Sequence, residues 1–157
     1  MMDQKTIQIL NSIHFAERYE ALRIQYSFNL KESFENYNNQ QVLNLLQEVG
    51  YITPKYQKGE NFFQSIKKVG LYRFEHKIKT KYGIVELIWD VMKNNQYFTG
   101  NSFSNLEYEL LNLEERHPLP IFRNYEDLRE ILTIAFQMFE DMTESFLKVY
   151  GESPQEG

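Results

Sequence analysis

The chain contains no cysteine, and only four prolines and seven glycines among its 157 residues. The absence of thiols excludes disulfides, thiolate nucleophiles and cysteine-ligated metal sites. The scarcity of glycine and proline excludes collagen-like and low-complexity architectures. No apolar run approaches the about 18 residues of a membrane-spanning helix, because the nearest candidate, residues 84–92, is short and carries two carboxylates. The first residues also lack the apolar core of a secretory signal, so we expect a cytoplasmic protein that does not contact a membrane.

The composition is that of an ordinary folded protein, with 42% hydrophobic, 15% aromatic and 25% charged residues. A disordered chain would be poorer in aromatic residues and carry a larger charge imbalance. The length predicts a single domain over residues 1–157, with residues 152–157 as a frayed tail. A chain of this size buries about 70% of the surface that its unfolded form exposes. The net charge of −5 argues against a generally basic nucleic-acid binder.

The N-terminal part of the chain is predicted to be helical. From Phe15 to Tyr37, aromatic and leucine side chains recur at steps of three and four, which is the pattern of one helix face. Residues 22–30 also alternate as a strand would, but the helix is favoured because its pattern lasts longer. A second, short helix is predicted to begin with a capping-box pattern at Asn38 and to end at Gly50.

The middle of the chain predicts an antiparallel meander. Apolar and polar side chains alternate along residues 72–79 and 85–91, and residues 96–103 form a third extended segment. Turn residues separate these segments, including an Asn-Asn pair at 94–95. The segment before the meander, residues 62–69, has helical spacing and predicts a short helix, with a strand as the alternative.

The C-terminal third predicts a connection followed by a long helix. Residues 104–122 contain several leucines and then two prolines, which predicts a partly helical, then extended, segment. Asn124 is a helix cap, and apolar residues keep helical spacing from Leu128 to Tyr150. Together these segments predict an α+β fold with N-terminal helices, a three- to four-stranded antiparallel meander and a long C-terminal helix packed on the sheet.

Patterns for catalysis and metal binding are sparse. No serine lies in a Gly-x-Ser-x-Gly turn and no glycine-rich phosphate loop is present, so no cofactor is implied. His76 lies on the apolar face of its predicted strand, where a core histidine is the favoured interpretation and a perturbed, functional imidazole is the alternative. Glu114 and His117 have the spacing of two ligands on one helix face, but a carboxylate-bridged metal site needs a second such pair. We therefore predict a protein that is not an enzyme and holds no metal.

Charge is unevenly distributed along the chain. Residues 55–81 carry eight basic residues against two acidic ones, and residues 107–157 carry twelve acidic residues against four basic ones. Arg73, Lys77 and Lys79 share one strand face and are the anion-binding residues of an alternative hypothesis, a nucleic-acid-associated module. The aromatic side chains of that strand point to the opposite face, so base stacking beside the charges is not expected. A solvated outer sheet face is the favoured interpretation.

Without a catalytic pattern, an acidic chain rich in aromatic residues is more naturally a binding protein, because tyrosine provides contact area at low entropy cost. Its build resembles that of bacterial immunity proteins from polymorphic or contact-dependent toxin systems. These features are small size, acidity, the absence of cysteine, and a meander between N-terminal helices and a long acidic helix. The resemblance covers residues 62–150 and includes no motif that assigns individual residues. It implies a protein that binds and blocks a cognate toxin domain.

The expected partner is a basic toxin domain, because a carboxylate-rich surface mimics the nucleic-acid backbone and steers association with basic nucleases. We expect the contacts to lie in the acidic stretch that follows the meander. The candidate contact residues are Glu107, Tyr108, Glu109, Glu114 and Glu115.

Overall fold

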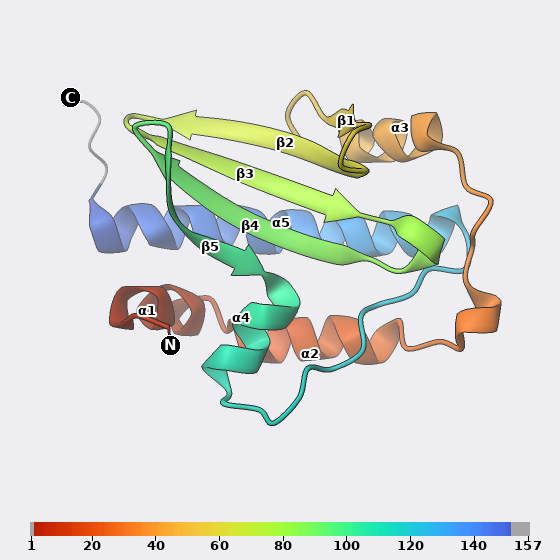
Figure 1. The fold of residues 1–157 in the computed structure, drawn as a ribbon, viewed down its shortest axis with the longest axis horizontal. Coiled ribbons are helices and arrows are strands. Elements are labelled where there is room, and N and C mark those ends of the chain that lie inside the picture. The colour runs from red at the N-terminus through yellow and green to blue at the C-terminus, as the bar shows by residue number, and fades with distance from the viewer. Residues whose placement is uncertain (1, 152–157) are drawn as a thin grey trace.

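The computed structural model describes residues 2–151, which form a five-stranded antiparallel sheet with a long helix along one face (Figure 1). The strands lie side by side in their sequence order, so each pairs with the next one along the chain. Their bounds are β1 Lys55–Gln57, β2 Phe62–Val69, β3 Tyr72–Lys79, β4 Glu86–Lys93 and β5 Gln96–Ser102. The α+β class predicted from the sequence is confirmed, with one or two more strands than expected.

Helix α5, Tyr125–Tyr150, lies behind the sheet in Figure 1, and the other helices gather around it. Helices α1 and α3 pack on α5, whereas α4 follows β5 and packs on β4 and α2. Their bounds are α1 Gln4–Ser12, α2 Phe15–Gln25, α3 Asn39–Val49 and α4 Phe103–Leu110, with two short 3-10 turns at η1 Leu30–Glu32 and η2 Lys81–Gly83. One face of the sheet is therefore covered by α5, and the other faces the viewer.

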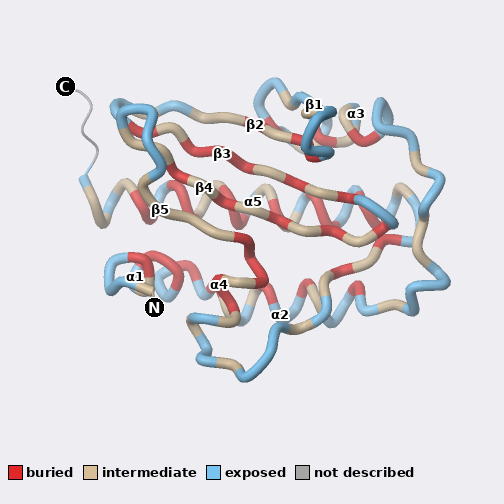
Figure 2. Tube along the Cα trace, in the orientation of Figure 1, coloured by how far each residue is buried: buried red, intermediate tan, exposed pale blue. Residues whose placement is uncertain are grey.

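The core lies between helix α5 and the side chains of β3 and β4 that point towards it. The His76 ring stacks on Phe139 at 4.4 Å between ring centres, and the Phe74 ring meets Phe146 edge-on at 5.3 Å. Trp89 on β4 is completely buried against Phe146. Figure 2 shows the consequence as an alternation of buried and half-buried residues along most of β4, whereas in β3 Glu75 on the outer face is buried as well. Burying a large apolar side chain in this way stabilises the fold by about 1.5–3 kcal/mol.

The helix predicted to begin at Phe15 is confirmed in α2, but it ends at Gln25 instead of continuing to Tyr37. Residues 22–30 are not a strand either. Beyond α2 the backbone pairs with the distant connection before α5, because Ile121 N–H donates to Tyr26 O at 2.9 Å. The later aromatic residues of the stripe still pack against the core from this irregular segment.

The short helix predicted over residues 62–69 is wrong, because this segment is strand β2. Its register places Phe63 opposite Ile78 and Val69 opposite Tyr72. Phe62 and Phe63, which face opposite sides of the sheet, are both buried, so the segment lacks the simple alternation of a half-exposed strand. Pairing with β3 therefore decides its conformation.

The other local predictions are confirmed except for the full capping box at Asn38, because the Asn38 backbone N–H donates to the Tyr125 hydroxyl at 2.8 Å and not to the Gln41 side chain. Asn38 caps α3 by accepting from the backbone N–H groups of Gln40 and Gln41, and Gly50 ends that helix with φ +126°. Asn124 caps α5 in the same way. Positive φ angles at 94 and 95 form the turn between β4 and β5, and residues 104–122 are helical first and irregular afterwards. The predicted frayed tail, residues 152–157, lies outside the described residues.

Candidate protein-binding groove along strand β5

The face of the sheet opposite α5 carries alternating charged and half-buried apolar residues. Because Phe74 and His76 point towards α5, their neighbours Arg73, Glu75 and Lys77 point away from it. No helix or strand of residues 2–151 is drawn over this face in Figure 1. The outer sheet face therefore carries all three residues of the predicted anion-binding stripe, Arg73, Lys77 and Lys79.

The predicted cationic stripe on this face is largely paired with acids. Arg73 Nε donates to Glu75 Oε2 at 2.8 Å, and Lys77 Nζ lies 3.2 Å from Asp90 Oδ2 and 3.5 Å from Glu75 Oε1. Lys79 is directly opposite Glu86 in the β3–β4 register. These carboxylates offset the positive potential that a phosphate backbone would need.

A shallow groove runs along β5, and we call it the β5 groove. Its central part, about 310 Å³, lies on the outer sheet face and is lined by residues from Glu86 to Asn105. It continues into a cleft of about 460 Å³ that shares Glu86, Ser102 and Asn105 and ends at residues 116–119. On the other side it continues over Gly100 and Asn101 into a cleft of about 150 Å³ against the start of α1.

The lining of the β5 groove contains more acidic than basic side chains, and two of its acids already have basic neighbours: Asp90 Oδ2 lies 3.2 Å from Lys77 Nζ, and Glu86 is opposite Lys79. Four carboxylates line its three parts, namely Asp3, Glu86, Asp90 and Glu109, whereas Arg116 is its one Lys or Arg among residues 2–151. Apolar contact area is available beside these charges. It is provided by Ile88, Tyr97, Pro118 and Leu119. A basic protein surface with apolar side chains is the complementary chemistry.

Gly100 shapes the floor of the groove. It has φ +131°, and a Cβ added there would overlap the Trp89 carbonyl oxygen and come within 2.7 Å of Asp90 Cα. Only glycine lets β5 lie this close to β4 at this point. Tyr97, whose side chain is mostly exposed, donates its hydroxyl to Gly100 O at 2.6 Å and is thereby held beside the groove.

Glu107, one of the predicted contact residues, is 1% exposed and is therefore not available to a partner in this conformation. Arg23 from α2 donates to Glu107 Oε2 at 3.1 Å from Nε and 2.6 Å from Nη2. His117 Nδ1 lies 3.0 Å from the other oxygen, Oε1. This buried carboxylate joins α2, α4 and the connection to α5, and it orients the His117 ring at the end of the β5 groove. Neither Arg23 nor His117 was recognised in this role from the sequence, because their common partner is distant along the chain.

The other four predicted contact residues lie at or near the surface. Tyr108 is half-buried beneath the Arg116 guanidinium, which is 4.4 Å from the ring centre. Glu109 is exposed and lines the β5 groove, while Glu114 and Glu115 are exposed in the connection that leads to its far end. Because Glu114 and His117 lie in this connection and not on a helix, the spacing predicted for two metal ligands is not realised. Residues 2–151 contain no cluster of three or more potential metal-ligating side chains.

His76 is a core residue, as the favoured interpretation predicted. Its side chain is 3% exposed, and its Nε2 has no hydrogen-bond partner among residues 2–151. Burial, with a smaller contribution from the Lys67 charge, lowers the pKa of His76 from 6.5 to about 3. The ring is therefore neutral at physiological pH and contributes packing against Phe139.

Comparisons with protein-family models, with curated proteins and with solved structures find no match to this chain. Within residues 2–151, every helix is too short or too polar to cross a membrane.

Proposed function

We propose that this chain is a non-enzymatic, cytoplasmic protein-binding domain that uses the β5 groove to bind a basic protein domain. The proposal rests on three adjoining clefts along β5, which share lining residues and together contain four carboxylates and one guanidinium, beside exposed and half-buried apolar side chains. The resemblance to immunity proteins makes the partner a toxin domain of the same bacterium, which the groove would block by occupying its basic surface.

The acidic groove would act mainly on the rate and selectivity of association. Carboxylates distributed over one surface attract a basic partner before contact and disfavour acidic ones. Affinity would come from apolar groups that lose water in the complex, with Tyr97 as the central candidate because it is 61% exposed and already fixed by Gly100. A stable complex would bury about 1,200–2,000 Å², so the interface would extend beyond the groove to Glu114 and Glu115.

The nucleic-acid alternative is less well supported, because the acids that pair with Arg73 and Lys77 occupy the same sheet face. Its test is simple: the purified chain should show no salt-dependent binding to a single-stranded oligonucleotide at low ionic strength.

The main experiment co-expresses the chain with the products of its flanking genes and measures growth and complex formation. The diagnostic change is Tyr97→Ala, and the matched control is Tyr82→Ala, since the two side chains are 61% and 58% exposed and Tyr82 lies outside the groove. Loss of a central aromatic contact of about 2 kcal/mol weakens binding about 30-fold. We expect this loss, together with reduced protection, only for Tyr97→Ala. Equal affinities for the two variants would refute the assignment of the groove.

A further inference from the structure

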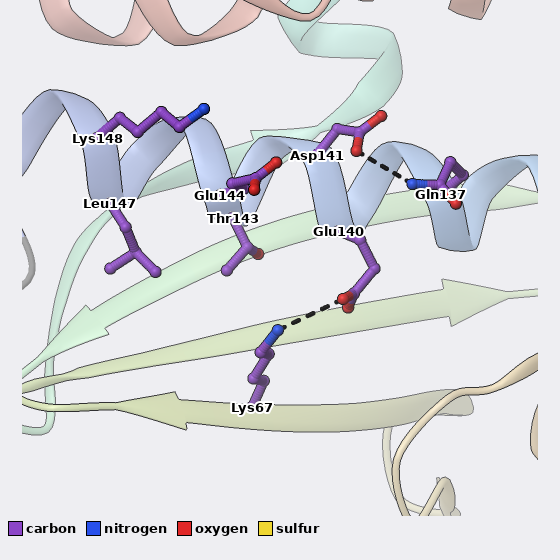
Figure 3. Close-up of a pocket in the computed structure, with 8 residues that line it drawn as sticks. All are labelled: Lys67, Gln137, Glu140, Asp141, Thr143, Glu144, Leu147 and Lys148. Atoms are coloured by element: carbon purple, nitrogen blue, oxygen red, sulfur yellow. Dashed lines mark hydrogen bonds and ion pairs between the residues drawn. The ribbon is translucent and has the colours of Figure 1, made fainter.

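A second cleft, about 750 Å³ in volume, lies between α5 and β2 (Figure 3). Figure 3 shows Glu140, Thr143 and Leu147 projecting from α5 towards the strands, while Lys67 reaches up from β2 to Glu140. Glu144, which follows Thr143 in α5, also lines the cleft. This cleft and the β5 groove share no lining residue, so the cleft is a separate site.

The ion pair that crosses this cleft is weak. Lys67 Nζ lies 3.4 Å from Glu140 Oε1, and the two side chains are 36% and 30% exposed. Exposed pairs of this kind contribute little to stability, so a better cationic partner can replace Lys67. Glu144 is exposed and makes no ion pair within residues 2–151. Glu140 and Glu144 are therefore the two carboxylates that a cation from outside can approach, in competition with Lys67 and Lys148, which also line the cleft.

Thr143 provides an independent sign of a missing partner. Its side chain is 1% exposed, yet its Oγ1 makes no hydrogen bond within residues 2–151. Buried hydroxyl groups normally have a partner, because leaving one without a hydrogen bond is unfavourable. A ligand that donates a hydrogen bond in this cleft would satisfy Thr143.

The edge of strand β2 beside the cleft is free. Strand β1 pairs only with Phe62–Gln64, so within residues 2–151 no strand lies on that side of residues 65–69 of β2, as the upper edge of the sheet in Figure 1 shows. Such an edge presents unpaired backbone donors and acceptors to which an extended peptide can add. The charged Lys67 and Lys68 restrict this pairing to a strand with suitable side chains.

We propose that an extended segment of a protein partner adds to β2 beside residues 65–69 and places an arginine or lysine side chain in the cleft. Its cationic group replaces Lys67 on Glu140, approaches Glu144 and donates a hydrogen bond to Thr143 Oγ1. The partner backbone continues the sheet, and alternate side chains point towards α5. This site takes an extended basic segment, whereas the β5 groove takes a folded basic surface.

The probe is a capped five-residue peptide of alternating valine and arginine, added to the full chain labelled for NMR. We expect slower hydrogen exchange at backbone amides within residues 65–69, and chemical-shift changes at Thr143 and Glu144. A peptide in which glutamate replaces arginine is expected to produce neither effect. Slower exchange is the essential readout, because attraction of a cationic peptide to an acidic surface does not by itself protect β2 amides.

Two pairs of variants separate specific binding from general electrostatics. Lys67→Ala removes the competing ammonium group and is expected to tighten peptide binding, whereas Lys68→Ala on the other face of β2 is expected to have a smaller effect. Replacing both Glu140 and Glu144 by glutamine is expected to weaken binding about tenfold, which corresponds to 1.4 kcal/mol. The control changes Glu17 and Glu20 of α2 to glutamine, which removes the same charge from exposed positions outside the cleft.

Thr143→Val keeps the shape of the side chain and removes the hydroxyl group. We expect it to fold normally by circular dichroism and to weaken the arginine peptide several-fold. The proposal is overturned if amides 65–69 exchange at the same rate with and without peptide, or if both glutamine pairs weaken binding equally. Shift changes confined to the β5 groove would also overturn it, while leaving the function proposed for that groove intact.

Discussion

His76 is expected to make the stability of this protein depend on pH in the range where few other groups titrate. In the folded state burial lowers the pKa of His76 to about 3, whereas the ordinary value is 6.5. Below pH 6.5 the unfolded chain takes up a proton at this position and the folded chain does not. The free energy of unfolding therefore falls as the pH decreases from about 6.5 towards 3.

The magnitude follows from the two pKa values. Each pH unit inside this window removes about 1.4 kcal/mol, so a change from pH 7 to pH 5 removes about 2 kcal/mol through His76 alone. His76→Phe keeps an aromatic ring on Phe139 and removes both the titration and the unpartnered Nε2. We expect this variant to be at least as stable as the native chain at pH 7, and about 2 kcal/mol less sensitive to the change to pH 5.

The assay is urea unfolding at pH 5, 6 and 7, analysed by linear extrapolation. Comparing the native chain with His76→Phe cancels the contributions of carboxylates and of the other histidines. Parallel loss of stability in the two proteins between pH 7 and pH 5 would refute the reasoning, because it would show that His76 binds a proton equally well in both states. If the phenylalanine ring is too large for the site, His76→Leu is the second variant and carries the same expectation.

Two further predictions concern residues that hold the β5 groove in place, both measured by urea unfolding. Glu107→Gln is expected to destabilise the fold by about 3–5 kcal/mol, because it leaves the Arg23 guanidinium without its buried counter-charge. The control, Glu109→Gln on the same helix, is expected to change stability by less than about 0.5 kcal/mol. Gly100→Ala is expected to cost about 1–3 kcal/mol through its positive φ and its overlap with β4, whereas Gly59→Ala, whose added Cβ has no atom of residues 2–151 within 4 Å, is expected to be close to neutral. Equal stability losses for Gly100→Ala and Gly59→Ala, or for Glu107→Gln and Glu109→Gln, would contradict the respective expectation.

The fold was predictable wherever a segment has one buried and one exposed face. Residues 72–79 alternate because β3 has α5 on one side and charged neighbours on the other, and α5 keeps a continuous apolar stripe towards the sheet. Prediction was wrong for residues 62–69, where Phe62 is buried on the outer face beneath the Lys77 ammonium, 5.3 Å from its ring centre. It was also wrong about where α2 ends, because backbone pairing with residues 121–122 replaces helical hydrogen bonds.

The candidate site was predictable only as an acidic region. Counting charges identified the stretch after the meander, and Glu109, Glu114 and Glu115 are indeed exposed there. The sequence gives no sign that Glu107, two residues from Glu109 on the same short helix, points inwards. Glu86 and Asp90 were counted only as charges of a strand, because their position beside β5 depends on strand pairing.

The sequence alone determined the features that depend on local periodicity and composition: the alternating strands, the long amphipathic helix, the capped helix ends, and the absence of thiol chemistry. These are local because strand alternation and helical spacing repeat over two to four residues. Only the tertiary structure decided which acids are buried and which border a groove. The reason is physical: the charge state and accessibility of a carboxylate depend on what lies across from it, and for Glu107 that is Arg23, 84 residues away along the chain.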